Sequence, residues 1–314
     1  MLRANHAVRL GLRSSSRNPE LAFVKALVDQ AGSLLATLPV ALGALLVFAV
    51  ARRWTLQGVL RALQAAEALR WPVFGGVVAA LSILFLAGML FWAAAIPLLA
   101  ADAEIDRRPP AGNFALLLSR GAARTLVAGL LGSGISILFT VACSLALLFA
   151  APLVLARPSA LLFALTAIVA AALIVGSILL DVLARLTLIR AAAFGDSATA
   201  AFGHAASLLG ARLGSYVAVT LAFVFLELIA GAIVATLTGF LSGVSLFDPR
   251  SELLAVPPRI AVGLAIAAVF AWLEVGRMGA LSALVADAEG LIAPEEPPQA
   301  ELVIDALPVD EQGA

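Results

Sequence analysis

Glu227 is the first candidate for chemistry, because an ionisable side chain at bilayer depth is costly and is retained for function or for pairing. It lies about thirteen residues into an apolar run, roughly 20 Å along a helix, and therefore near mid-membrane. A functional carboxylate there would be a proton or cation site in a translocation path. A structural carboxyl there would form a hydrogen bond across helices, and the sequence leaves both interpretations open.

Four further charged residues form two pairs with helical spacing. Asp181 and Arg185 are four residues apart, and Glu274 and Arg277 are three apart, so each pair shares one face of its helix. Both pairs lie near the inner ends of their apolar runs, at similar depth. We expect one interhelical network of Asp181, Arg185, Glu274 and Arg277, which would act either as architectural glue or as a cytoplasmic gate.

Two prolines fall inside the first two apolar runs. Pro39 and Pro97 are candidate kinks, and a broken helix can line a binding site. A kink that neighbouring helices simply accommodate is the structural alternative.

No constellation of known catalytic chemistry is present in the sequence. The two histidines, His6 and His204, lie outside the apolar runs, so no histidine relay or metal cluster is expected within the membrane. There is no GxSxG elbow, Walker-type loop or GxGD motif. Cys143 is the only cysteine. We therefore predict no catalytic, cofactor-binding or metal-binding residue and no enzyme activity, with lipid-modifying chemistry as a minor alternative.

The elements that must position these residues are six long apolar runs. Hydrophobic residues make up 62% of the 314-residue chain and charged residues 13%, about half the share in soluble domains. Each run holds at least the roughly 20 residues that cross a bilayer: 31–50, 73–100, 126–151, 158–180, 214–244 and 260–285. The fold class predicted is an all-α integral membrane protein with a transmembrane domain over 31–285.

The distribution of positive charge indicates the orientation. The side that holds the N-terminus carries thirteen Arg and Lys residues and the other side seven. By the positive-inside rule both termini should be cytoplasmic. Residues 52–71 have apolar and polar faces and are expected to form a helix in the outer interface. A short turn is expected at 151–159, and an outer loop with one helical turn at 245–259.

The segments before the third and fifth runs share a pattern. Phe, Ser and Arg recur at a spacing of five and five, 88 residues apart, as Phe114, Ser119 and Arg124 and as Phe202, Ser207 and Arg212. Residues 1–30 form a looser, Arg-rich counterpart. We predict three hairpins, each preceded by a cytoplasmic amphipathic helix, as parallel repeats. Phe139 occupies the place of Glu227 in the preceding repeat, so the carboxylate departs from the pattern.

The last segment, 286–314, is rich in acidic residues and proline and is expected to be a disordered cytoplasmic tail.

The segments FALLLSRGAARTLVAGL and AAFGHAASLLGARLGSYV resemble bacterial six-span proteins related to the membrane region of glycerophosphodiester phosphodiesterases. The resemblance implies a helical bundle in the bacterial inner membrane. It carries over no activity, because the chain has no phosphodiesterase module.

Three functions fit these observations. The first is a non-catalytic membrane scaffold or partner subunit that presents residues 288–314 and the amphipathic helices to proteins or to anionic lipid headgroups. The second is a transporter or channel component that uses Glu227. The third is the lipid-modifying enzyme. The bilayer itself is the expected partner, a homo-oligomer is possible, and no nucleic-acid partner is expected.

Overall fold

The computed structural model describes residues 2–51, 56–105, 114–156, 159–245 and 249–292. Within them the chain forms eight α-helices and no β-strand. The helices are α1 (Ala4–Arg17), α2 (Pro19–Ala51), α3 (Leu56–Ile105), α4 (Phe114–Ala156), α5 (Ala160–Ala193), α6 (Ala198–Ala211), α7 (Leu213–Ser245) and α8 (Pro249–Ala288). The all-helical class expected from the sequence is confirmed for these residues.

Six of the helices, α2, α3, α4, α5, α7 and α8, are long and apolar enough to cross a membrane. Their apolar side chains are largely exposed along most of their length, as Leu38, Phe163 and Ile233 illustrate. Exposed apolar surface on this scale marks a surface that faces lipid. The chain is a polytopic membrane protein.

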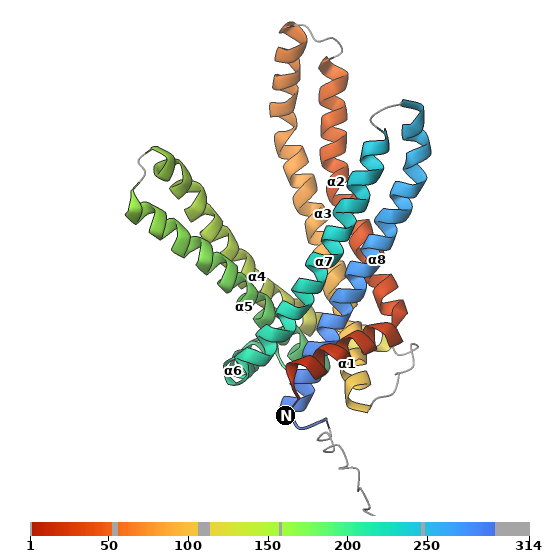
Figure 1. Ribbon diagram of the computed structural model, residues 1–314, viewed down its shortest axis with the longest axis vertical. Helices are drawn as coiled ribbons and strands as arrows, with labels where there is room; N and C mark the ends of the chain where they lie inside the picture. The colour runs from red at the N-terminus through yellow and green to blue at the C-terminus, as the bar shows by residue number, and fades with distance from the viewer. Residues whose placement is uncertain (1, 52–55, 106–113, 157–158, 246–248, 293–314) are drawn as a thin grey trace, which may run out of the picture.

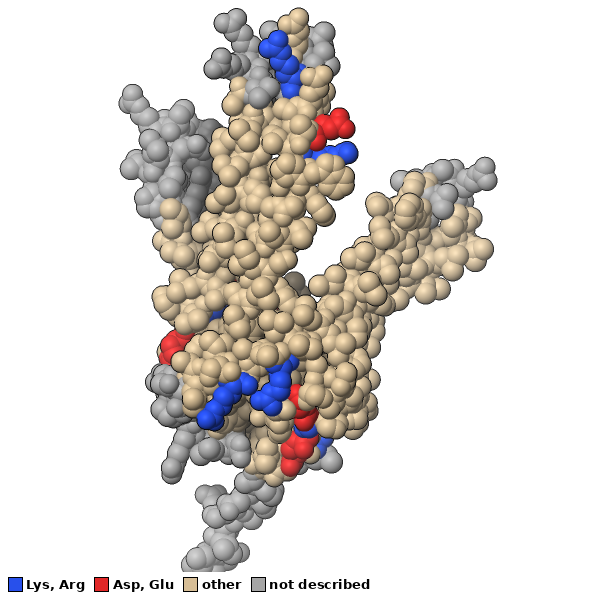
Figure 2. All heavy atoms as spheres, turned by 180° about the vertical axis from the view of Figure 1, so that it is seen from behind, with Lys and Arg blue, Asp and Glu red and all other residues tan. Residues whose placement is uncertain are grey.

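Consecutive long helices lie side by side as three pairs, α2 with α3, α4 with α5 and α7 with α8 (Figure 1). The pairs converge at one end of the molecule, where α1 and α6 also lie, and they diverge toward the other end. The convergent end is called the base here, and the diverging parts of the six helices are called the arms. Figure 2 shows the open notch between two arms and an uncharged surface over most of their length.

The packed core lies in the base. It is built from residues 91–99 of α3, 182–191 of α5 and 271–286 of α8, together with the first half of α7. Tyr216, Phe223, Ile96, Leu186 and Met278 are among the largest fully buried side chains. Burial of large apolar side chains contributes about 2 kcal/mol for each of them, so the base holds the three pairs together.

Three connections differ from the sequence expectation. Residues 56–71 are the first part of the single helix α3 rather than a separate helix in the interface, and residues 52–55 lie outside the described residues. Helix α4 runs through Pro152 to Ala156, into the expected turn. Helix α8 begins at Pro249, within the expected loop, because proline at the first position of a helix leaves no intrahelical hydrogen bond unmade.

The two candidate kinks lie inside continuous helices. Helix α2 runs through Pro39 and helix α3 through Pro97, so neither helix is broken there. A bend at these positions stays a prediction. The tail begins after α8 ends at Ala288, and residues 293–314 lie outside the described residues.

The segments that enter the pairs are not alike. Helices α1 and α6 are separate short helices, whereas the segment from Phe114 is continuous with the rest of α4. The turn before α6 caps that helix: Gly195 has a φ of 76° and the Ser197 side chain accepts a hydrogen bond from the Ala200 amide. Glycine adopts this left-handed conformation without strain. Residues 112–113, which precede α4, lie outside the described residues.

Candidate functional site

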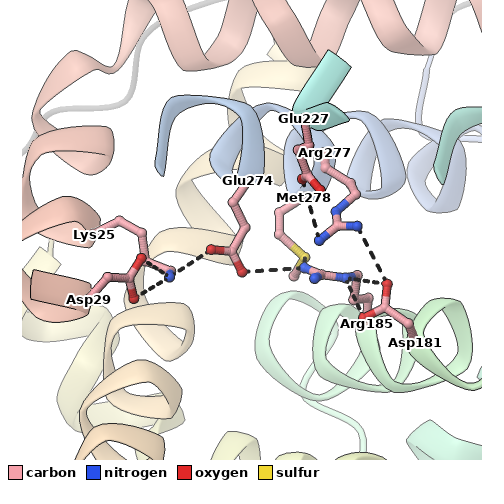
Figure 3. A network of polar contacts seen from close by, with 8 residues as sticks. All are labelled: Lys25, Asp29, Asp181, Arg185, Glu227, Glu274, Arg277 and Met278. Carbon is pink, nitrogen blue, oxygen red and sulfur yellow. Dashed lines mark hydrogen bonds and ion pairs between the residues drawn. The ribbon is translucent and has the colours of Figure 1, made fainter. Parts of the chain in front are cut away.

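A network of ion pairs joins the four helices α2, α5, α7 and α8 (Figure 3). Glu274 of α8 is its centre. One carboxylate oxygen, Oε2, lies 2.6 Å from Lys25 Nζ of α2, and the other, Oε1, lies 3.6 Å from Arg185 Nη1 of α5. Lys25 Nζ also donates to both carboxylate oxygens of Asp29, at 2.7 and 2.6 Å. Glu274 therefore connects α2 to α5 through α8.

Arg185 continues the network on α5. Its Nε donates to both oxygens of Asp181, one turn earlier, at 3.1 and 2.9 Å. Its Nη1 lies 3.5 Å from the Met278 sulfur of α8. The pair Asp181 and Arg185, predicted from i, i+4 spacing, forms as expected.

Arg277 of α8 closes the network toward α7, but more loosely. Its Nη1 lies 3.6 Å from Asp181 Oδ2 and its Nη2 lies 3.8 Å from Glu227 Oε1. The side chain is 10% exposed, and its Nε is buried without a hydrogen-bond partner among the described residues. Glu227 is thus held against a cation, at the periphery of the network rather than alone in the membrane.

The network contains four carboxylates and three cations, so the fully ionised cluster carries one excess negative charge. The cations are the more buried partners: Lys25 is 8% exposed, whereas Asp29 and Asp181 are 42% and 39% exposed. Removing one partner from a buried ion pair leaves an uncompensated charge and typically costs about 3–5 kcal/mol. The network is therefore suited to fixing the helix pairs relative to one another.

The structure brings together all five charged residues predicted from the sequence and adds two that the sequence interpretation missed. Lys25 and Asp29 fall within residues 1–30, which the sequence interpretation places before the first span as a cytoplasmic amphipathic segment, whereas α2 already begins at Pro19. Their i, i+4 spacing, typical of a helical ion pair, was the available signal. Pro39 and Pro97 make no part of the network.

A second polar cluster lies in the base, below the network. Arg190 Nε donates to Asp196 Oδ2 at 2.8 Å, and the same oxygen lies 3.0 Å from His204 Nδ1. Arg190 also pairs with Glu289 and lies over the Phe194 ring at 4.6 Å. Burial raises the pKa of Asp196, but hydrogen bonds from His204 and Arg190 outweigh it and hold that pKa below its usual range. This cluster links the turn after α5 to the end of α8.

Three arginines tie the start of each helix pair to its end. Arg17 Nη1 lies 3.6 Å from Asp102 Oδ1 at the end of α3. Arg124 Nη1 donates to the Gly195 carbonyl after α5 at 2.8 Å. Arg212 Nη1 pairs with Asp287 Oδ2 near the end of α8 at 2.5 Å. We call these contacts the base clasps. Each joins residues about one helix pair apart in the sequence.

The described residues hold no group of three or more His, Cys, Asp or Glu side chains that could bind a metal ion. The contacts that join helices in the network are ion pairs. Comparison of the chain with models of protein families, with curated proteins and with solved structures finds no match in any of the three.

Proposed function

We propose that the protein is a non-catalytic membrane scaffold, or the membrane subunit of a larger assembly, in which the base fixes three helix hairpins and the arms present lipid-facing surfaces to partners. The observation that carries this proposal is the network centred on Glu274, which joins helices from all three pairs. Each of its members pairs with a group of opposite charge, Glu227 included. Paired charges of this kind are suited to architecture.

Helix lengths support a place for the base at the inner face of the bilayer. Lys25 lies 5.9 Å from the Trp92 ring of α3, and α3 rises about 30 Å from Trp92 to Trp71. This equals the thickness of the hydrocarbon layer. Trp92 is buried in the base, whereas Trp71 is 66% exposed and suits the outer boundary, where tryptophan is enriched. Under this placement the network, with Glu227, lies near the inner boundary rather than at mid-membrane.

The base clasps support three repeated units. Each unit would begin with an amphipathic or arginine-bearing helix on the cytoplasmic side, cross the membrane twice, and close with an arginine contact from its first segment to its last. The departures from the repeat are Glu227 and the continuous entry into α4. A bacterial inner membrane with both termini cytoplasmic is the location that we propose.

The scaffold proposal is tested by capture of neighbours from the native membrane. A photo-crosslinking residue at Phe163 or Ile233, both exposed on the arms, should yield a discrete crosslinked protein band. The same residue at Leu186, which is fully buried in the base, is the matched control and should give none. Lipid adducts alone at both arm positions would contradict a scaffold that uses these surfaces.

The runner-up function is a transporter or channel component. The excess carboxylate of the network favours it, because Glu227 is the member with the longest ion-pair distance. Purified protein in liposomes should then move protons, ions or solute, and Glu227→Gln should abolish the flux while leaving the melting temperature within a few degrees. We expect no flux and only a small change in stability, since under the scaffold proposal Glu227 merely pairs with Arg277.

A further inference from the structure

Helix α1 has one buried face and one charged face. Ala7, Gly11, Ser14 and Ser15 are buried, whereas Asn5, Arg9, Arg13 and Ser16 are exposed. The exposed residues follow one another at helical spacing and form a polar stripe. Helix α1 contains no acidic residue, so Arg9 and Arg13 give this stripe a net positive charge.

The buried face fixes α1 against α8 at the level of the network. A Cβ atom added at Gly11 would lie 2.2 Å from the Gly276 carbonyl oxygen, so the two backbones are in close contact. Gly276 stands between Glu274 and Arg277 in sequence. Helix α1 lies across the long helices rather than along them (Figure 1), which is the orientation of a helix in a membrane interface.

Exposed apolar residues extend along α2 and α7 as far as the level of the network. Phe23 of α2 is 64% exposed, two residues before Lys25, and Phe225 of α7 is 63% exposed, two residues before Glu227. These rings require acyl chains beside them. The arginine stripe of α1 therefore lies where the acyl chains end and the phosphates of the inner leaflet begin, under the orientation proposed above.

We propose that the exposed stripe of α1, with Arg9 and Arg13 one turn apart, binds the phosphates of anionic phospholipids in the inner leaflet. Guanidinium groups donate bidentate hydrogen bonds to phosphate, and basic side chains near an anionic surface each contribute about fivefold to binding. This inference rests on the proposed orientation. Lipid binding would set the depth of α1 in the membrane and would thereby position the segment of α8 that carries the network.

The test uses full-length protein in liposomes, with Ser16→Cys on the exposed stripe and Cys143→Ser to remove the native thiol. A fluorophore at position 16 is quenched by headgroup spin-labelled phosphatidylglycerol or phosphatidylcholine. We expect at least threefold stronger quenching by phosphatidylglycerol. Arg9→Gln with Arg13→Gln should abolish this preference, so that the two lipids quench equally. Arg61→Gln with Arg70→Gln, exposed arginines on the far part of α3, should leave it unchanged.

Several results would overturn the proposal. Equal quenching by the two lipids, or a preference that survives the Arg9 and Arg13 substitutions, would show that the stripe does not select anionic lipid. Loss of the preference in inorganic phosphate, but not in chloride of equal ionic strength, would assign the stripe to free phosphate. A preference that appears only after deletion of residues 293–314 would show that the acidic tail, and not lipid, occupies the stripe in the full-length protein. Partner capture by the arms is unaffected by these substitutions, so the scaffold proposal stands or falls separately.

Discussion

At the scale of single residues, Glu274 carries more of the network than Glu227 does. Glu274 is within 2.6 Å of Lys25 and 3.6 Å of Arg185, whereas Glu227 lies 3.8 Å from Arg277 and makes no hydrogen bond among the described residues. A short contact to a buried cation is the interaction whose loss leaves a charge unpaired in a medium of low dielectric constant. Substitution by glutamine should therefore lower the stability of the protein more at Glu274 than at Glu227.

We predict that Glu274→Gln lowers the free energy of unfolding by about 3 kcal/mol, because Lys25 would keep only Asp29 as its counter-ion and Arg185 only Asp181. Glu227→Gln should lower it by less than about 1 kcal/mol, a value typical of loosely paired, partly exposed charges. Thermal or denaturant unfolding of purified protein in mild detergent measures both. Equal losses for the two variants would contradict a network centred on Glu274.

Much of this site could be predicted from the sequence, because the spacing of charged residues along a helix and their position within an apolar run indicate which of them lie close together. Asp181 and Arg185 pair as their i, i+4 spacing predicts. Glu274 and Arg277, at i, i+3 spacing, both belong to the network but contact residues of other helices. Lys25 and Asp29 were missed because hydropathy marks where a run becomes apolar, not where a helix begins. The sequence places Glu227 in the middle of its apolar run, and its depth in the membrane stays a prediction. The lower part of α7 packs in the base, where Tyr216 and Phe223 are buried, and the proposed orientation accordingly puts Glu227 nearer the inner boundary.

At the scale of elements, the contact between α1 and α8 was beyond sequence analysis. It joins residues far apart in the chain, and in a sequence with 25 glycines nothing singled out Gly11 or Gly276. The same limit applies to α3: Leu56–Ile105 is one helix, and its amphipathic first part has the same periodicity whether it is a separate helix or not. Packing against α2, not local pattern, decides between the two.

We predict that Gly11→Ala separates α1 from α8, because the new methyl group would meet the Gly276 backbone, which cannot move aside as a side chain can. The cost should be about 1–3 kcal/mol, as for other overpacked contacts. Labelling of Ser15→Cys, buried in the native protein, should accelerate in the same background of Cys143→Ser. Gly203→Ala in α6 is the control, since nothing lies within 4 Å of its added Cβ and alanine favours a helix.

At the scale of the whole molecule, packing and charge divide the protein along its length. The base is buried, ion-paired and clasped by Arg17, Arg124 and Arg212, while the arms expose apolar side chains and diverge (Figures 1 and 2). A structure of this kind is stable only if a solvent other than water covers the arms. Under the proposed orientation, the base and the far ends of the arms lie on opposite sides of a bilayer.

This division predicts a definite topology. In the Cys143→Ser background, a thiol introduced at Ser16 on α1 should react with a membrane-impermeant maleimide only in inside-out vesicles, because the proposed orientation puts the base at the cytoplasmic face. A thiol at Gln64, exposed on α3 about 10 Å beyond Trp71, should react only in right-side-out preparations. Reaction of both thiols from the same side would contradict a topology in which the base and the far ends of the arms lie on opposite sides of the bilayer. Reversed labelling would show that the orientation inferred from the arginine count is inverted.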